Sequence, residues 1–224
     1  MPQSSGIIVG CDQNQEWLLP WWWEHYSREN AYPVLFVDFG MSEKAIHWCQ
    51  QRGTYSPLKQ DTASVFFKKP LALLQSPFAS SLWIDLDCQI NGPLDPLLQT
   101  LAFGIEIALV KEDESVHRRD RKSGQLHSDE ISYNTGVIAF RQGAPILHLW
   151  ANMPQTFRDD QYALARVLYT HKTQFLELPA IYNWPNDHGP NEKAIIRHFH
   201  GPHGKLEILK QLVLLQHVID EPAT

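Results

Sequence analysis

The chain has few cysteines, and they are widely spaced. Its 224 residues include three, Cys11, Cys49 and Cys88, an odd number with no closely spaced pair. Such a set fits a reducing compartment better than a disulfide framework, and it contains no zinc-like CxxC pair. We therefore expect a cytoplasmic protein with reduced thiols.

Basic excess and long apolar runs are also missing. The chain has 19 Lys and Arg against 25 Asp and Glu, a formal net charge of -6, so its overall field opposes binding to nucleic acid. No segment has the roughly 20 consecutive apolar residues of a transmembrane helix, and the first residues lack the pattern of a leader. The sequence predicts no nucleic-acid partner and no transmembrane segment.

Aromatic residues are concentrated near the start of the chain. The segment EWLLPWWWEHY (16–26) contains Trp17, Trp21, Trp22 and Trp23. Tryptophan favours membrane interfaces, which leaves peripheral membrane contact as one interpretation. Aromatic helical faces are more often core, and basic residues are scarce nearby, so we favour a helix packed on a sheet.

Short apolar runs alternate with helix-compatible segments. The runs lie at 6–11, 32–39, 81–86, 105–110, 135–140 and 194–199, and the helical segments at 13–30, 42–53, 93–103, 145–152 and 159–171. This alternation is typical of an α/β fold with a mostly parallel central sheet and helices on both faces. The length suits a single domain spanning 1–224. Ligands of such sheets bind at the carboxyl ends of the strands.

Two segments interrupt this alternation. Segment 111–130, KEDESVHRRDRKSGQLHSDE, is densely charged and is predicted to be a mobile surface loop. It could be an active-site lid or an acceptor-binding loop, or a solvated excursion with no role. The tail 205–219 is apolar at close to helical spacing, which predicts a C-terminal helix docked on the body.

Two carboxylates follow the third apolar run, in SLWIDLDCQING (81–92). Alternate residues of a strand point the same way, so Asp85 and Asp87 are predicted to share a face while Leu86 points to the core. Such a pair could hold Mg²⁺ or Mn²⁺ and so neutralise a nucleotide diphosphate. The pattern favours a metal-dependent sugar-nucleotide transferase, although an isolated D-x-D is common by chance.

A histidine- and glycine-rich stretch, IIRHFHGPHGK (195–205), follows the last apolar run. His198 could complete the metal shell, and Lys205 could add charge beside a phosphate. Gly201 would let backbone N–H groups approach phosphate oxygens. The alternatives are a glycine turn with solvated histidines or an incomplete zinc site.

Other polar residues have both a structural and a functional interpretation. Asp12 ends the first apolar run and could contact a base or ribose, or it could be the N-cap of a capping box formed with Gln15. Asn134 could make a turn, Asp160 could cap the helix at 160–171, and Asn183 could brace the loop before a proline.

Together these segments resemble glycosyltransferase family 8 and related retaining enzymes of the GT-A fold, over most of the chain. The resemblance rests on the strand ending in Asp12 and on WIDLD (83–87), YNTGVIAF (133–140), DDQ (159–161), LPAIYNW (178–184) and HFHGPHGK (198–205). Gln15 stands where the family commonly has an aromatic residue. The resemblance implies a GT-A-like Rossmann-type sandwich.

The resemblance also implies a function. A hexosyl unit would pass from a nucleotide-diphosphate sugar, a UDP-sugar by expectation, to an acceptor hydroxyl with retention of anomeric configuration. The acceptor could be a carbohydrate, a glycolipid or a protein. By resemblance the metal ligands for Mn²⁺ or Mg²⁺ are Asp85, Asp87 and His198, the donor-binding residues are Asp12, Asn134, Gly136, Asn183, Gly201 and Lys205, and the catalytic residues are Gln161 and Asp160.

Two competing functions stay open. A sugar-nucleotide pyrophosphorylase uses a similar sheet but normally has a glycine-rich phosphate loop near the start, and none follows GIIVGC (6–11). The other is a non-catalytic carbohydrate-binding or partner protein on a degenerate transferase scaffold, against which the presence of both aspartates and His198 argues.

Overall fold

The computed structural model describes residues 4–60, 64–171, 173 and 175–220. Its strands are β1 (Ser5–Cys11), β2 (Val34–Asp38), β3 (Thr54–Pro57), β4 (Ser80–Ile84), β5 (Cys88–Ile90), β6 (Ile107–Lys111), β7 (Tyr133–Arg141), β8 (Phe175–Leu178), β9 (Trp184–Pro185) and β10 (Ile196–His198). Its α-helices are α1 (Leu19–Glu29), α2 (Glu43–Gln50), α3 (Lys68–Leu73), α4 (Asp95–Thr100), α5 (Glu114–Lys122), α6 (Pro145–Ala151), α7 (Asp160–Thr170) and α8 (Gly201–Asp220). Short 3-10 turns occur at Glu16–Leu18, Val65–Phe67, Leu101–Phe103, Ala180–Tyr182 and Asn186–His188.

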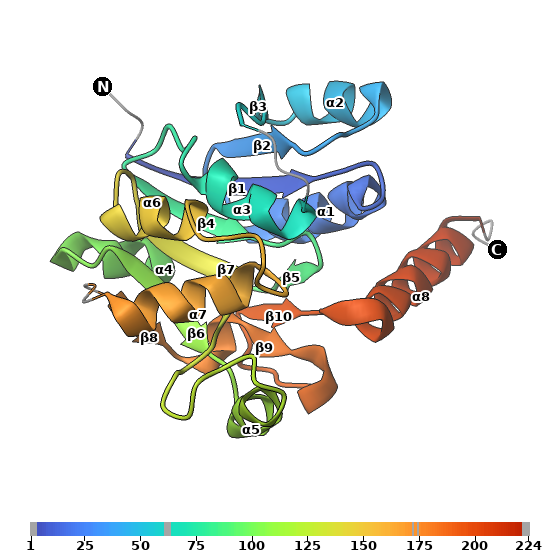
Figure 1. Ribbon diagram of the computed structural model, residues 1–224. Helices are drawn as coiled ribbons and strands as arrows, with labels where there is room; N and C mark the ends of the chain where they lie inside the picture. Colours follow the sequence, from blue (N-terminus) through green and yellow to red (C-terminus); the bar gives the residue numbers. More distant parts are fainter. Residues whose placement is uncertain (1–3, 61–63, 172, 174, 221–224) are drawn as a thin grey trace.

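A seven-stranded sheet of order β3-β2-β1-β4-β7-β6-β8 forms the centre of the molecule (Figure 1). Its strands are parallel except β7, which is antiparallel to both β4 and β6. Every apolar run of the sequence contains a strand, and every helix-compatible segment contains a helix. The predicted α/β fold class is confirmed.

The inner strands are apolar on both sides because a helical layer covers each face. In β1, Ile7 and Val9 belong to one buried cluster, with α1, α2 and α4, whereas Ile8 belongs to another, with α3, α6 and α7. Side chains of a strand alternate between faces, so one short segment supplies both layers of the core.

The tryptophans of α1 and of the 3-10 turn before it pack in or against the core. Trp21 and Trp22 are fully buried, and Trp17 and Trp23 are partly buried against the same cluster. The interpretation of this segment as a packed helix is confirmed. No helix within the described ranges combines the length and the apolar composition that crossing a membrane requires.

A second sheet, of order β5-β10-β9, lies beside the main one and brings distant segments together. Its register pairs Cys88 with His198. The strand expected at 81–86 ends at Ile84, and the chain then turns, with the Cys88 N–H donating to the Asp85 carbonyl at 3.0 Å. Asp85 and Asp87 therefore do not alternate along one strand, because this turn separates them.

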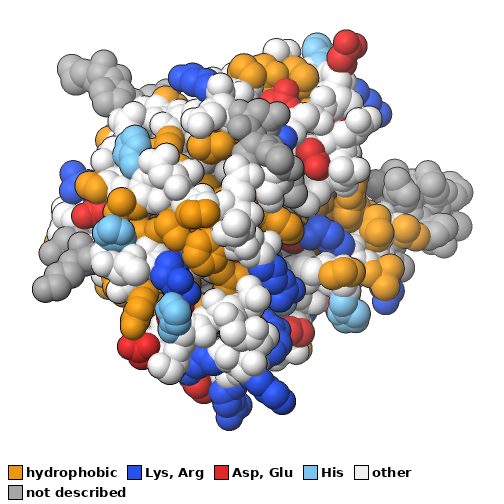
Figure 2. Space-filling view, viewed as in Figure 1, with side chains coloured by type: hydrophobic (Ala, Val, Ile, Leu, Met, Phe, Trp, Pro, Cys, Tyr) orange, Lys and Arg blue, Asp and Glu red, His pale blue; other side chains and the backbone are white. Residues whose placement is uncertain are grey.

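The prediction of a loop at 111–130 is wrong for its central part, which forms α5. The Asp113 carboxylate caps this helix by accepting hydrogen bonds from the N–H groups of Ser115 and Val116. The following turn is anchored by Glu130, which is fully buried and accepts a hydrogen bond from Arg166 of α7 at 2.9 Å. Buried ion pairs therefore order a segment that has little apolar surface. Lys and Arg side chains gather over α5, at the bottom of Figure 2.

The C-terminal helix α8 begins at residue 201, four residues before the predicted start at 205. Ile208 is buried in the core, whereas Leu206, Leu209 and Val213 are between 44% and 50% exposed. The helix extends away from the sheet (Figure 1). The helix contacts the body up to Leu212, which packs against the core cluster.

Candidate active site

A cavity of about 590 Å³ lies where β1 and β4 end and β7 begins. It is lined by all the residues predicted for the site except one: Asp12, Asp85, Asp87, Asn134, Gly136, Asp160, Gln161, His198, Gly201 and Lys205. The exception, Asn183, lies behind this lining and contacts two of its members. Clefts of this volume commonly hold small ligands, and the carboxyl ends of parallel strands are their usual place.

Asp87 and His198 form a buried pair that lines the cavity. Asp87 Oδ1 lies 3.3 Å from His198 Nε2, and Asp87 Oδ2 accepts a hydrogen bond from Lys205 Nζ at 2.8 Å. Burial alone would raise the pKa of Asp87, but the positive charges of His198 and Lys205 hold it well below its usual range. Burial alone would lower the pKa of His198, but the Asp87 carboxylate raises it. The Asp87 carboxylate is therefore ionised, and His198 and Lys205 balance its charge.

The orientation of the His198 ring is set from both sides. Its Nδ1 lies 3.0 Å from Asn183 Oδ1, so Nδ1 donates and Nε2 faces Asp87. The ring packs directly on Gly136, where an added Cβ would lie 2.2 Å from His198 Cε1. Glycine is required there because any side chain would displace the imidazole.

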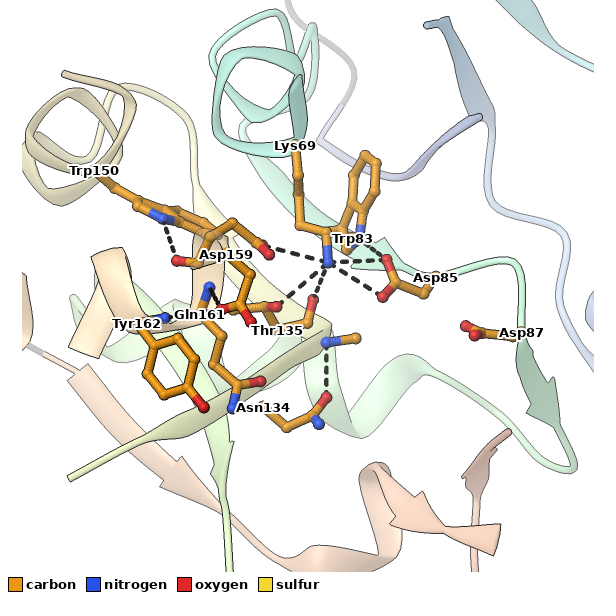
Figure 3. A network of polar contacts seen from close by, with 12 residues as sticks. Lys69, Trp83, Asp85, Asp87, Asn134, Thr135, Trp150, Asp159, Gln161 and Tyr162 are labelled. Atoms are coloured by element: carbon orange, nitrogen blue, oxygen red, sulfur yellow. Dashed lines mark hydrogen bonds and ion pairs between the residues drawn. The ribbon is translucent and has the colours of Figure 1, made fainter. Parts of the chain in front are cut away.

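Asp85 lies apart from this pair, next to Lys69 (Figure 3). Its carboxylate accepts hydrogen bonds from Trp83 Nε1 at 2.6 Å and from Lys69 Nζ at 3.1 Å. Of the three metal ligands predicted from the sequence, the structure brings Asp87 and His198 together, while Asp85 pairs with a lysine. The donor atoms of Asp87 and His198 fit a divalent cation, which accepts carboxylate and imidazole ligands.

Lys69 is a site residue that sequence reasoning missed. Its ammonium group contacts the Thr135 carbonyl at 3.0 Å, Asp85, and Asp160 Oδ2 at 3.6 Å (Figure 3). Burial alone would lower the pKa of Lys69, but the carboxylates of Asp160 and Asp85 raise it. It lies on α3, a helix that no periodic apolar pattern in the sequence indicated.

Asp160 is buried at the first turn of α7. The helix cap expected of it is provided by Asp159, whose carboxylate accepts hydrogen bonds from the N–H groups of Gln161 and Tyr162 at 3.1 and 3.2 Å. Burial raises the pKa of Asp160 to about 6, against the opposing effect of Lys69. Asp160 is thus free to face the cavity.

The opposite wall is a hydrogen-bonded row of side chains. Glu112 Oε1, also missed from the sequence, accepts from Gln161 Nε2 at 3.0 Å and from Asn134 Nδ2 at 2.9 Å. Asn134 Oδ1 accepts from Asn183 Nδ2 at 2.7 Å. The row therefore connects Gln161 to the partner of His198. Glu112 follows β6 directly, and its place at a strand end was the only sign of it in the sequence.

Asp12 and Gly201 lie at two further edges of the cavity. Asp12 Oδ1 accepts hydrogen bonds from the N–H groups of Asn14 and Gln15 at 3.0 and 3.2 Å, so it caps a turn while its side chain borders the cavity. Gly201 has a φ of 74° and begins α8. Free N–H groups at such a helix start, with Lys205 one turn further, suit a phosphate.

No protein-family model matches the chain, and no curated protein matches it either. Solved structures do match. The galactosyltransferase LgtC, solved with donor and acceptor sugar analogues, has a TM-score of 0.61 at 14% identity, over 88% of this chain and 87% of LgtC. The fold is that of GT-A glycosyltransferases.

Other GT-A structures agree. Mouse xyloside xylosyltransferase 1 has a TM-score of 0.58 at 12% identity, over 88% of this chain and 97% of that protein. The bifunctional glycosyltransferase WbbM has a TM-score of 0.62 at 11% identity, over 91% of this chain and 47% of WbbM. The chain thus spans about half the length of WbbM.

Proposed function

We propose that the protein is a metal-dependent glycosyltransferase that moves a hexosyl unit from a nucleotide-diphosphate sugar to an acceptor hydroxyl. One observation carries this proposal: a single cavity collects the residues predicted to bind the nucleotide, the metal, the phosphates and the sugar from five separate stretches of the chain. The GT-A fold supports it, as does the binding of donor and acceptor analogues by LgtC.

The diphosphate side of the cavity would be formed by Asp87, His198 and Lys205. Asp87 and His198 would hold Mn²⁺ or Mg²⁺, and the bound cation neutralises the negative charge of the leaving diphosphate. Lys205 and the start of α8 at Gly201 lie on the same wall and add positive charge there. Negative charge builds on the diphosphate as its bond to the sugar breaks. These positive groups would therefore stabilise the transition state more than the ground state, and that difference accelerates the transfer.

The sugar side would be formed by Asp160, Gln161 and Asn134. Gln161 Nε2 is engaged by Glu112 and by Ser132 Oγ, both at 3.0 Å, which fixes the amide plane. The amide oxygen then remains to stabilise positive charge on the anomeric carbon. An amide is a poor nucleophile, so we propose attack by the acceptor on the same face and retention of configuration. One LgtC structure is named for a glutamine-to-glutamate substitution in its active site, so that protein too has a glutamine in its active site.

We also propose which nucleotide the donor carries and which segment binds the acceptor. Asp12 borders the far end of the cavity and would contact the nucleobase of a UDP-sugar. Glu112 and the first turn of α5 also line the cavity, which supports an acceptor-binding role for segment 111–130. The acceptor would be a carbohydrate, a glycolipid or a protein, reached in the cytoplasm or at a membrane surface.

A non-catalytic carbohydrate-binding protein on the same scaffold is the second candidate. Each aspartate has a lysine partner, Lys69 for Asp85 and Lys205 for Asp87. This favours the second candidate, since the lysines balance the carboxylate charges without a metal ion. A binding protein would need no leaving-group activation.

Donor turnover tests the proposal. Release of nucleoside diphosphate from nucleotide sugars, measured with and without Mn²⁺, should require the metal. It should be lost in Asp87→Ala and kept in Asp95→Ala, which removes an exposed carboxylate outside both the cavity and segment 111–130. Metal binding without turnover on any donor would indicate the binding protein. NMR of the product should show the retained anomer, and an inverted product would remove Gln161 from its proposed role.

A further inference from the structure

A buried thiol lies beside the two side chains proposed to hold the catalytic cation. One oxygen of Asp87, one ring nitrogen of His198 and Sγ of Cys88 lie within 4.8 Å of one another. The three residues are 7%, 5% and 0% exposed, respectively. Among the residues that the structure describes, this is the one place where three such donor groups converge.

The fold itself creates this grouping. Cys88 and His198 are opposite each other in the antiparallel pair of β5 and β10, and the turn after β4 carries Asp87 into the same corner. The nearest polar contact of Cys88 Sγ is the Gly136 carbonyl, at 3.9 Å. A thiol is a weak donor, so this contact leaves the sulfur available to a stronger partner.

The composition of the group selects the kind of ion. One carboxylate, one imidazole and one thiolate are ligands that suit Zn²⁺, and the soft sulfur also suits Cd²⁺. Mn²⁺ and Mg²⁺ prefer oxygen ligands and gain little from sulfur. Asp85, which could offer a further oxygen ligand, is paired with Lys69 outside the group.

We propose that Cys88 makes this corner a site for soft divalent cations. Zn²⁺ or Cd²⁺ would be bound by Asp87, Cys88 and His198 and would displace Mn²⁺ from the two residues that both ions share. Binding would release the thiol proton to solvent and would move the Lys205 ammonium group away from Asp87. The inference shares Asp87 and His198 with the proposed function, but the binding itself needs no transferase activity.

The direct test is X-ray absorption on the wild-type protein loaded with one equivalent of Zn²⁺. A sulfur neighbour at about 2.3 Å is expected. Cys88→Ser should remove it and weaken Zn²⁺ binding by at least about tenfold, because even groups that only support metal ligands are worth about 10- to 100-fold. Mn²⁺ affinity, read from the electron paramagnetic resonance of free Mn²⁺, should stay unchanged. The matched control Cys49→Ser removes a buried thiol outside the cavity and should change neither affinity.

A shell of nitrogen and oxygen alone around Zn²⁺ in the wild type would overturn the inference, whatever the variant does. So would a folded Cys88→Ser protein that binds Zn²⁺ as tightly as the wild type, or wild-type protein from which Zn²⁺ fails to displace Mn²⁺. A sulfur neighbour of Zn²⁺ in a protein with no donor turnover would contradict the proposed function but support the inference about Cys88. Donor turnover in a protein whose Zn²⁺ has no sulfur neighbour would support the proposed function but contradict that inference.

Discussion

Lys69 is the side chain around which the charges of the cavity are arranged. It is almost fully buried and faces Asp85 and Asp160. A buried lysine keeps its charge only when carboxylates compensate for lost hydration, and here two do. The pKa of Asp160 is raised to about 6 because the effect of burial is larger than the opposing effect of the Lys69 charge.

The pH dependence of stability should reveal Asp160. Its pKa in the folded protein is about 6, whereas an unfolded aspartate titrates near about 3.9. Between these values the folded state binds a proton that the unfolded state has lost. Stability should therefore fall as the pH rises from about 4 to about 6, by at most about 3 kcal/mol. Urea unfolding of the metal-free protein should show this slope reduced in Asp160→Asn. Equal slopes in the two proteins would show that Asp160 does not titrate in this range.

Glu112 should act as a positioning residue for Gln161. Glu112→Ala frees two amide groups at once, so kcat for transfer should fall by about tenfold or more while the KM for donor changes little. Glu112→Gln keeps an acceptor oxygen and should restore most of the activity. Steady-state kinetics on both variants checks this, and equal kcat values for Glu112→Ala and the wild type would contradict it.

The element that matters most for the proposed metal site is the small sheet. Strands β5 and β10 come from distant parts of the chain, and their register alone places His198 beside Asp87. Gly136, on strand β7 of the main sheet, packs against the His198 ring. The geometry of the site therefore depends on contacts between two sheets.

Gly136→Ala should damage the metal site selectively. The new Cβ would lie 2.2 Å from His198 Cε1 and 2.6 Å from Nδ1, so the ring must move. Isothermal titration with Mn²⁺ should show at least about tenfold weaker binding by a folded protein. The matched control is Gly92→Ala, whose Cβ meets only the side chain of Ile195, at 3.2 Å. Equal Mn²⁺ affinities in the two variants would exclude the proposed role of the ring.

Helix α5 is held by a different kind of contact. Arg166→Ala leaves the carboxylate of Glu130 buried without its partner, which should lower the free energy of unfolding by about 3 kcal/mol. The control Arg28→Ala breaks a pair whose side chains are 58% and 46% exposed, and it should change stability by less than about 1 kcal/mol. Urea denaturation compares the two, and similar losses would mean that the buried pair does not anchor the segment.

At the scale of the whole molecule, charge decides what the cavity accepts. The chain has a net charge of -6, and the cavity is lined by several carboxylates. An anionic donor is repelled by both, so its binding should depend on a bound cation.

Thermal shift should show this dependence. A ligand that binds only the folded state at about 100 times its Kd adds about 2.7 kcal/mol, or roughly 5 to 10 °C in Tm for a chain of this size. Nucleotide sugar with Mn²⁺ should give such a shift, and chelation of the metal or Asp87→Ala should abolish it. A shift of the same size in the presence of a chelator would favour the two lysines as the cationic partners.

Much of the fold could be predicted from the sequence, because the spacing of apolar residues indicates which positions are buried. The run at 6–11 is apolar at every central position, and only a strand covered on both faces buries all of them. Helix α5 was missed for the converse reason. Its buried residues are His117 and Asp120, and polar side chains give no apolar period.

What the sequence determined by itself was the fold class and most of the predicted residues that line the cavity, since strands, turns and the polar residues after them are local features. The tertiary structure alone decided how those residues are paired. Asp85 faces Lys69, Asp87 faces His198, and Cys88 lies next to the latter pair. These pairings join segments more than a dozen residues apart, and their geometry depends on strand register and on buried charge, which no local pattern encodes.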